Sequence, residues 1–236
     1  MKIMSENTLY QFGTLSSLLA GAMDGGKTIN DLLKHGDFGI GTLDGSDGEL
    51  MVINGQAFHA RQTGDVVKLS GNETVPYAAV AYFEPKYEFP LIQNENSKTI
   101  GKLIYDHLKS VNLFHAIQIK GTFKHMHVRV VPKQQKPYRP FSAVVQPEFE
   151  ADNISGTIVG FYTPELFHGV SVSGYHLHFL SDDGQFGGHI MDYELAEGII
   201  TMQALTEFTQ GFPSTQNFLE TEFDVHELIK EIEVSE

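Results

Sequence analysis

The spacing of hydrophobic residues changes along the chain from a helical to a strand-like pattern. Between residues 8 and 35, the segments LSSLLAGAM and TINDLLKHG carry apolar residues three and four positions apart, which predicts two short helices. Thr28 stands where it can cap the second one. From Phe38 onward, short apolar runs such as FGIGTL, GELMVI and VPYAAVAYFEP alternate with turn residues, as is typical of β-strands. The Asn54-Gly55 pair between two such runs predicts a β-hairpin.

The clearest helical pattern covers residues 98–113, and Ser97 or Thr99 can cap its start. Four apolar residues fall on one face of this helix: Ile100, Leu103, Ile104 and Leu108. Strand patterns then resume in LFHAIQIKGTFKHMHVRVVP, SGTIVGFYTPE, HGVSVSGYHLHFLS and GGHIMDYELAEGIITMQAL. We therefore predict the α+β class, with mostly antiparallel or mixed β-sheets, a few helices and two sheet-containing subdomains.

The polar segment KQQKPYRPFSAVVQPEF, which contains several prolines, is the candidate domain boundary. We interpret residues 1–236 as a single unit. A subdivision near 132–152 would separate an N-terminal mixed-sheet part from a C-terminal part that carries the histidine motif described below.

Composition and charge exclude several classes of function. The chain has 236 residues, of which 41% are hydrophobic and 19% charged, so it is long and apolar enough to form a sizeable core. Its net charge of -14 argues against binding to nucleic acid or to an anionic membrane, because both need clustered Lys and Arg. The first residues lack the apolar core of a signal peptide, and no apolar run reaches the ~18 residues of a membrane span. We expect a cytoplasmic protein.

Three histidines are the strongest chemical signal. The chain has no cysteine, so a metal would have to bind His, Asp or Glu. In GYHLHFLSDDGQFGGH, His176 and His178 are two positions apart and share one face of a strand, and the turn-rich segment after them returns His189 toward the pair. Three neutral imidazoles that leave a coordination position open are typical of a catalytic divalent transition metal, with Zn²⁺ the first choice.

Other charged residues allow two interpretations each. His125 and His127 have the same spacing, but Lys124 and Arg129 flank them, and we expect them on an exposed strand face. Glu49, at the start of an apolar strand, is either a site acid or a solvated turn residue. Arg129, between β-branched residues, either meets a carboxylate or extends along the sheet surface.

The sequence resembles the bacterial acetolactate decarboxylase family from about Leu9 to the C-terminus. The resemblance rests on LYQFGTLSSLLAG, DFGIGT with DGEL, VPYAAVAYF, KPYRP, GTIVGFYTPE and above all SGYHLHFLSDDGQFGGH followed by DYEL. It implies that His176, His178 and His189 hold a catalytic Zn²⁺ or another divalent metal. It also implies roles for five further residues: Glu49, Arg129 and Glu236 in catalysis, and Thr42, Arg129 and Glu233 in substrate binding. Because the acids near the C-terminus follow an IExxE pattern, either Glu233 or Glu236 can be the site residue, and we prefer Glu236.

The resemblance further implies the reaction. Members decarboxylate 2-acetolactate to (R)-acetoin in the butanediol pathway, and a homodimer suits the family. The metal would chelate the keto and hydroxyl oxygens of the substrate and stabilise the enediolate that remains after CO₂ leaves. Arg129 would bind the carboxylate or the developing oxyanion, and Glu49 or Glu236 would then protonate the enediolate.

Two alternatives accompany this prediction. A cupin-like metal- or small-molecule-binding protein also uses two histidines two residues apart on a strand. Its third histidine lies on a more distant strand, whereas only ten residues separate His178 from His189 here. The second alternative is a relative that has lost its activity, which the retention of Arg129 and the acidic residues argues against.

Overall fold

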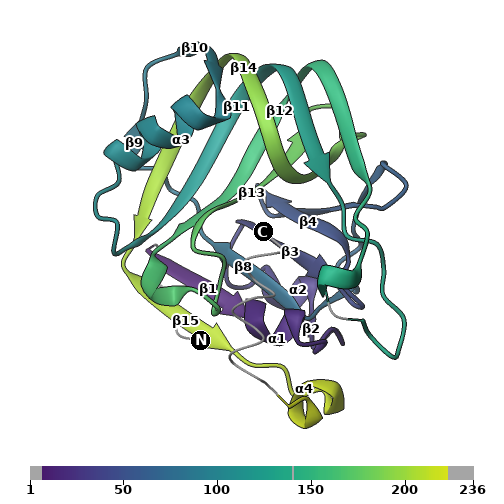
Figure 1. The fold of residues 1–236 in the computed structure, drawn as a ribbon. Coiled ribbons are helices and arrows are strands. Elements are labelled where there is room, and N and C mark those ends of the chain that lie inside the picture. Colours follow the sequence, from purple (N-terminus) through teal and green to yellow (C-terminus); the bar gives the residue numbers. More distant parts are fainter. Residues whose placement is uncertain (1–6, 140, 223–236) are drawn as a thin grey trace.

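The computed structural model describes residues 7–139 and 141–222, and these residues form two large β-sheets with few helices (Figure 1). This confirms the predicted α+β class with mostly antiparallel and mixed sheets. Glu233 and Glu236 lie outside the described residues.

The first sheet has seven strands and is mixed. Its only parallel pair among the described strands joins β15 to β1, and the remaining neighbours are antiparallel. In spatial order the strands are β15 (Glu207–Gly211), β1 (Thr8–Phe12), β8 (Tyr77–Ala81), β3 (Phe38–Leu43), β4 (Asp47–Ile53), β5 (Gln56–Ala60) and β6 (Val66–Lys68). Asn54 and Gly55 connect β4 to β5 with positive φ angles of 52° and 71°, which confirms the predicted hairpin.

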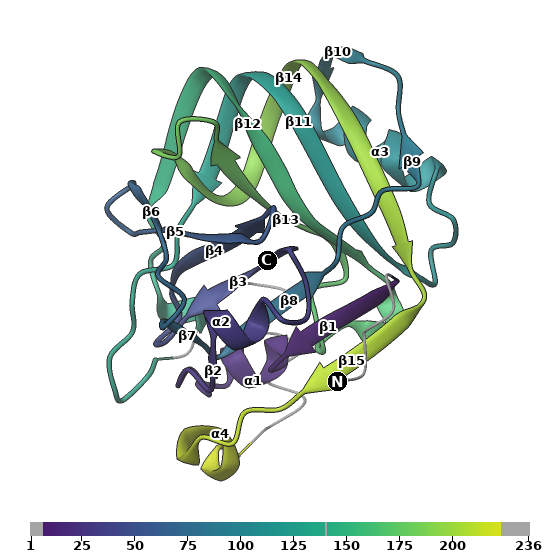
Figure 2. The same ribbon diagram turned by 180° about the vertical axis from the view of Figure 1, so that it is seen from behind.

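The second sheet is antiparallel and built around three long, strongly curved strands, β11, β12 and β14 (Figures 1 and 2). Its strands in spatial order are β10 (Ile92–Asn96), β14 (Gly187–Leu205), β11 (Phe114–Arg129), β12 (Glu148–Thr163) and β13 (Gly174–Ser181), and β9 (Tyr87–Glu88) pairs with β14. Because β13 pairs with both β12 and β14, the strands β11, β12, β13 and β14 close on themselves at one end of the sheet.

The helices are short, and the sequence-based prediction was wrong about some of their ends. The helices are α1 (Leu15–Leu19), α2 (Ile29–Leu32), α3 (Ser97–Asp106) and α4 (Gln216–Glu220), with 3₁₀ turns at Phe141–Ala143 and Glu165–Phe167 and a small two-stranded sheet of β2 (Lys27–Thr28) and β7 (Thr74–Val75). Thr28 caps α2 by accepting a hydrogen bond from the Asp31 amide, as predicted. The cap of α3 is Asn96 and not Ser97 or Thr99.

Helix α3 ends at Asp106, well short of the predicted residue 113. The His107 ring lies 2.8 Å from the Leu103 carbonyl through Nδ1, and the Asn112 amide donates to the Ser110 hydroxyl. These local bonds offer the backbone an alternative to further helix, as Ser and Asn commonly do. The prediction also missed that residues 8–12 form strand β1 within the segment expected to be partly helical.

The polar segment between β11 and β12 does not separate the two sheets. The strands on either side of it pair with one another over almost their whole length, from His115 opposite Tyr162 to Arg129 opposite Glu148. The first sheet, in turn, takes its edge strand β15 from the C-terminal part of the chain. A chain boundary near 132–152 therefore does not coincide with the division between the two sheets, although two sheet layers exist as expected.

Apolar side chains from both sheets form the core between the layers. Phe38, Ile40 and Met51 of the first sheet pack with Ala116, Val159 and Phe161 of the second. A second core lies between α3 and the second sheet, where Ile100 and Ile104 are almost fully buried, at 1% exposed each. Met51 of β4 and Leu180 of β13 belong to the first of these cores, and burial of its apolar surface stabilises the contact between the two strands.

Candidate metal and active site

Three histidine rings meet where the second sheet faces the first. His176, His178 and His189 each offer a ring nitrogen, and these nitrogens lie within 4.8 Å of one another. The ring centroids are 5.1 to 5.5 Å apart. Among the residues that the structure describes, no other group of three His, Asp or Glu side chains converges in this way.

The strand pairing brings the rings together. His176 and His178 point to the same side of β13, and the turn after Ser181 returns the chain so that His189 on β14 pairs directly with His178. On its other side, His189 pairs with Arg129 of β11. The hairpin predicted from SDDGQFGG therefore forms. All three histidines lie on strands that are hydrogen-bonded to their neighbours at the closed end of the sheet.

The histidines are in the protonation state that binds metal. Burial, opposed by the hydrogen bond to Leu50 and assisted by the Arg129 charge, lowers the pKa of His178 to about 4. Burial likewise lowers the pKa of His176 and of His189 well below the ordinary value, with smaller contributions from the neighbouring histidines and Arg129. At neutral pH all three rings are therefore uncharged, as ligation requires.

Hydrogen bonding also fits a metal. His178 Nδ1 lies 3.0 Å from the Leu50 carbonyl oxygen and must carry the proton that it donates, so the lone pair of Nε2 faces the cavity. His178 Nε2 and His176 Nδ1 are buried and have no hydrogen-bond partner among the described residues. Buried polar atoms are rarely left unsatisfied unless a ligand completes them. The donor set thus fits a divalent transition metal.

Glu49 lies beside the histidines and is 5% exposed. Its Oε1 accepts a hydrogen bond of 3.0 Å from the Val131 amide, and its Oε2 lies 3.4 Å from His178 Nε2. The preceding Gly48 has a φ of +65°, and a Cβ there would stand 2.1 Å from the Ala60 carbonyl oxygen. The segment Asp47-Gly48-Glu49 therefore needs glycine at its centre, because a side chain there would collide with the Ala60 backbone.

Arg129 and Thr42 complete the predicted set. An Arg129 guanidinium nitrogen lies 3.5 Å from His189 Nε2, so the cation is beside the histidines and not extended along an outer surface. Thr42 is buried, and its hydroxyl donates to the Gly48 carbonyl at 2.7 Å. Thr42 therefore supports the turn before Glu49.

One narrow cavity contains all the predicted site residues that the structure describes. Thr42, Glu49, Arg129 and the three histidines line it together. The sequence analysis did not identify the other lining residues, which come from α1, from strands β3 and β8, from a turn and from the chain after β11: Leu15, Leu18, Leu19, Gly41, Ser46, Tyr77, Val131, Phe141 and Gln146. No pattern in the sequence marks these residues as part of a site, because only the fold brings them to the cavity. The other paired histidines lie elsewhere, where His125 contacts Asp152 and His127 contacts Glu148 on partly exposed strand surface.

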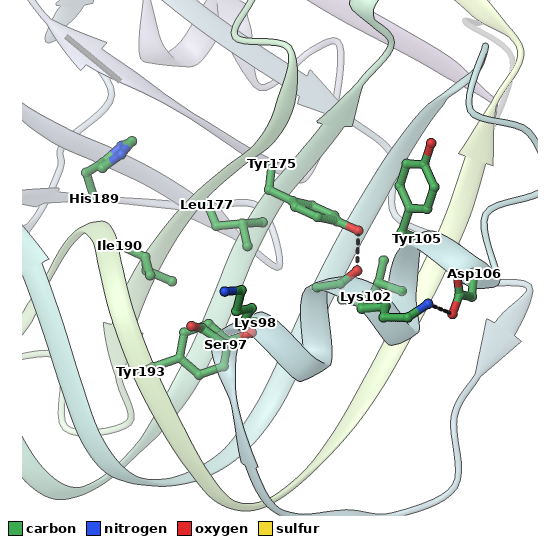
Figure 3. A pocket seen from close by; sticks show the side chains of 12 residues that line it. Ser97, Lys98, Lys102, Tyr105, Asp106, Tyr175, Leu177, His189, Ile190 and Tyr193 are labelled. Carbon is green, nitrogen blue, oxygen red and sulfur yellow. Dashed lines mark hydrogen bonds and ion pairs between the residues drawn. The ribbon is translucent and has the colours of Figure 1, made fainter. Parts of the chain in front are cut away.

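A larger cavity, of about 720 Å³, lies between α3 and strands β13 and β14 (Figure 3). Tyr175 crosses it and donates to the Gly101 carbonyl at 2.7 Å. His189 stands at one end of the lining residues, away from Tyr105 and Asp106 at the other end (Figure 3). Apart from His189, no predicted site residue lines this larger cavity, so the predicted chemistry belongs to the smaller one.

Sequence comparisons find related proteins that match nearly the whole chain. The alpha-acetolactate decarboxylase family pattern matches residues 9–225. The alpha-acetolactate decarboxylase of Streptococcus thermophilus is 46% identical over 97% of this chain and 98% of its own length. That of Lactococcus lactis subsp. cremoris is 44% identical over 99% of this chain and 100% of its own length.

Solved structures show the same fold. The crystal structure of alpha-acetolactate decarboxylase from Bacillus subtilis has a TM-score of 0.94 and 37% identity, and covers 97% of this chain and 99% of that one. The crystal structure of a Staphylococcus aureus protein of unknown function, described as similar to alpha-acetolactate decarboxylase, also has a TM-score of 0.94. The two sequences are 42% identical, and the match covers 98% of this chain and 100% of the other. The extent of these matches excludes the cupin alternative. The chain belongs to the alpha-acetolactate decarboxylase family.

Proposed function

We propose that this protein catalyses the metal-dependent decarboxylation of 2-acetolactate to (R)-acetoin. The observation that carries the proposal is the convergence of three neutral histidines with Glu49 and Arg129 in one buried cavity. Family membership supports the same reaction, because the relatives are named for it.

The three histidines would hold the metal, with Zn²⁺ the first choice for three nitrogen ligands and an open position. When bound, the metal supplies a Lewis acid to the keto and hydroxyl oxygens of the substrate. His178 keeps a fixed tautomer through its hydrogen bond to Leu50, so its ligating nitrogen is already oriented.

Arg129 binds the substrate carboxylate. The chain carries a net charge of -14, so an anionic substrate needs a local cation in the cavity, and Arg129 lies beside His189. The forked donors of guanidinium match a carboxylate, which lysine cannot do in the same geometry. Thr42, in contact with the same cavity, adds a further substrate-binding surface.

Glu49 delivers the proton. Loss of CO₂ breaks a C–C bond and leaves its electron pair in the enediolate, and one proton added to carbon completes acetoin. Glu49 is the described acid in the cavity, and protonation from its side alone would set the configuration of the product. Glu236, with Glu233 as the alternative, is the second candidate acid.

Three further properties are part of the proposal. A homodimer and a role in acetoin formation toward butanediol follow from the family resemblance, and light scattering would test the dimer. A cytoplasmic location is the third of these properties, and cell fractionation would test it. Among the described residues, no helix combines the length and hydrophobicity of a membrane span.

The direct test is to incubate the purified protein with racemic 2-acetolactate and to separate the acetoin enantiomers by chiral chromatography. Formation of (R)-acetoin at a rate far above the spontaneous decarboxylation supports the proposal. Product formation at the spontaneous rate, or a racemic product, contradicts it.

A further inference from the structure

Ser46 lies in the turn between β3 and β4 and combines three unfavourable features. It is 0% exposed, its φ is +54°, and its hydroxyl is buried without a hydrogen-bond partner among the described residues. A positive φ is uncommon for residues other than glycine, and an unsatisfied buried hydroxyl costs free energy. Costs of this kind persist in native proteins mainly where function requires them.

The turn around Ser46 is held rigidly in this conformation. The Asp44 amide donates to the Thr74 carbonyl at 2.9 Å, the Gly45 amide to the Met23 carbonyl at 2.8 Å, and the Gln134 amide to the Gly45 carbonyl at 2.7 Å. These bonds connect the turn to three distant segments of the chain. The two residues before Ser46 are therefore held in place.

Gln146 offers a second unsatisfied atom on the same cavity. Its Oε1 is buried and has no hydrogen-bond partner among the described residues. Ser46 and Gln146 both line the cavity that the three histidines line. A ligand bound beside the histidines therefore lies in the same cavity as both atoms, and one ligand can satisfy both.

We propose that Ser46 and Gln146 bind the substrate and recognise its hydroxyl and carboxylate groups; this inference rests on the proposed function. 2-Acetolactate has one hydrogen-bond donor, its tertiary hydroxyl, whereas its carboxylate and ketone only accept. Gln146 Oε1 can only accept, so it pairs with the hydroxyl of the substrate. The Ser46 hydroxyl donates to the carboxylate and adds to the binding by Arg129.

The first test is the kinetics of Ser46→Ala, with Asn54→Ala as the matched control. Asn54 has a similar φ of 52°, but lies in the exposed turn between β4 and β5, far along β4 from the cavity. We expect Ser46→Ala to raise KM and lower kcat/KM by about 10- to 100-fold, as for a lost hydrogen bond to a charged group. Because the hydroxyl has no partner in the free protein, the melting temperature should match that of the control or exceed it.

Ser46→Gly repeats this test with a residue that favours positive φ, in case alanine prevents folding. A kcat/KM within twofold of wild type in a folded variant overturns the role of Ser46. So does a large loss of stability with kcat/KM unchanged, which would show a structural role.

The second test addresses Gln146 with two stable carboxylates, 2-hydroxy-2-methylbutanoate and 2-methylbutanoate, as competitive inhibitors. They differ only in the hydroxyl, so the ratio of their inhibition constants measures its recognition. We expect Gln146→Leu to reduce this ratio about fivefold or more relative to wild type, and Gln146→Glu, which keeps an acceptor, to retain it. Gln134→Leu, in the same connector, is the control.

An unchanged ratio in Gln146→Leu overturns the role of Gln146. If wild-type protein produces acetoin and all Ser46 and Gln146 variants behave like it, only this inference fails. If wild-type protein produces none, the proposed function fails and this inference with it.

Discussion

Glu49 Oε2 lies 3.4 Å from His178 Nε2, and the next residue of β4, Leu50, accepts a hydrogen bond from the other nitrogen of the same ring. One strand of the first sheet thus places an acid beside a histidine of the second sheet and fixes the tautomer of that histidine. The low pKa of His178, about 4, keeps the ring neutral at pH 7, so the pair is not an ion pair there. The site is complete only when the two sheets pack against each other.

Glu49→Gln tests the acid. The amide oxygen of Gln can still accept from the Val131 amide, so the fold should persist, but the side chain can no longer deliver a proton. We expect kcat to fall by about 100-fold or more, as for loss of a general acid, with metal content unchanged. Steady-state acetoin assays and elemental analysis check both parts. Wild-type turnover in this variant would remove Glu49 from the mechanism.

His178→Ala should abolish bound metal and acetoin formation together, because two nitrogen ligands hold a divalent ion much more weakly than three. His168→Ala is the control, since His168 is an exposed residue whose ring contacts Ser173. Full activity in a metal-free His178→Ala protein would contradict the metal-dependent reaction.

Arg129→Lys retains the positive charge but removes the paired N–H donors of the guanidinium group. We expect turnover to fall about tenfold or more while the metal remains bound. Arg61→Lys, at an exposed ion pair with Asp65, is the control and should behave like wild type. An Arg129→Lys enzyme with normal kcat/KM would show that a point charge is sufficient.

Removal of residues 233–236 tests the acids near the C-terminus. If Glu233 or Glu236 belongs to the site, acetoin formation should fall strongly while the thermal unfolding of the truncated protein matches that of the full chain. Normal activity after truncation would leave Glu49 as the proton donor and assign no role to the tail.

Asp152→Asn tests the assignment of His125 to a surface ion pair. The hydrogen bond that the His125 ring donates to the Asp152 carboxylate raises the pKa of His125, with smaller contributions from neighbouring charges. A raised pKa in the folded state stabilises the protein below the ordinary value of 6.5, and this contribution is lost as pH rises through the raised pKa. We expect the variant to lower the His125 pKa in an NMR titration and to cost less than about 1 kcal/mol at pH 6, with no cost at high pH. An unchanged pKa would contradict the pairing.

The sequence predicted the parts of the fold that local patterns determine. The period-two strands, the Asn54-Gly55 hairpin and the return of His189 toward His178 follow from residue spacing alone. Strand β1 was missed because its parallel partner, β15, lies almost two hundred residues away, and no local pattern records such a pair. The end of α3 was misplaced because the local bonds of His107 and Ser110 replaced the helical ones.

For the site, motifs identified the residues that carry chemistry, and tertiary packing decided the rest. Sequence alone left a solvated turn position open for Glu49, yet packing of β4 on the second sheet buries it. Ser46 and Gln146 were not predicted, since a serine in a turn and a glutamine in a polar connector are ordinary there. Only their burial without partners distinguishes them.

The central claim is that three imidazoles hold one divalent metal on which decarboxylation depends. Elemental analysis of the purified protein, paired with acetoin assays before chelation, after chelation and after metal is restored, tests it most directly. We predict about one divalent metal ion per chain, loss of acetoin formation when the metal is removed, and recovery when Zn²⁺ or a similar ion is returned. Full acetoin formation by a protein that elemental analysis shows to be metal-free would contradict the account.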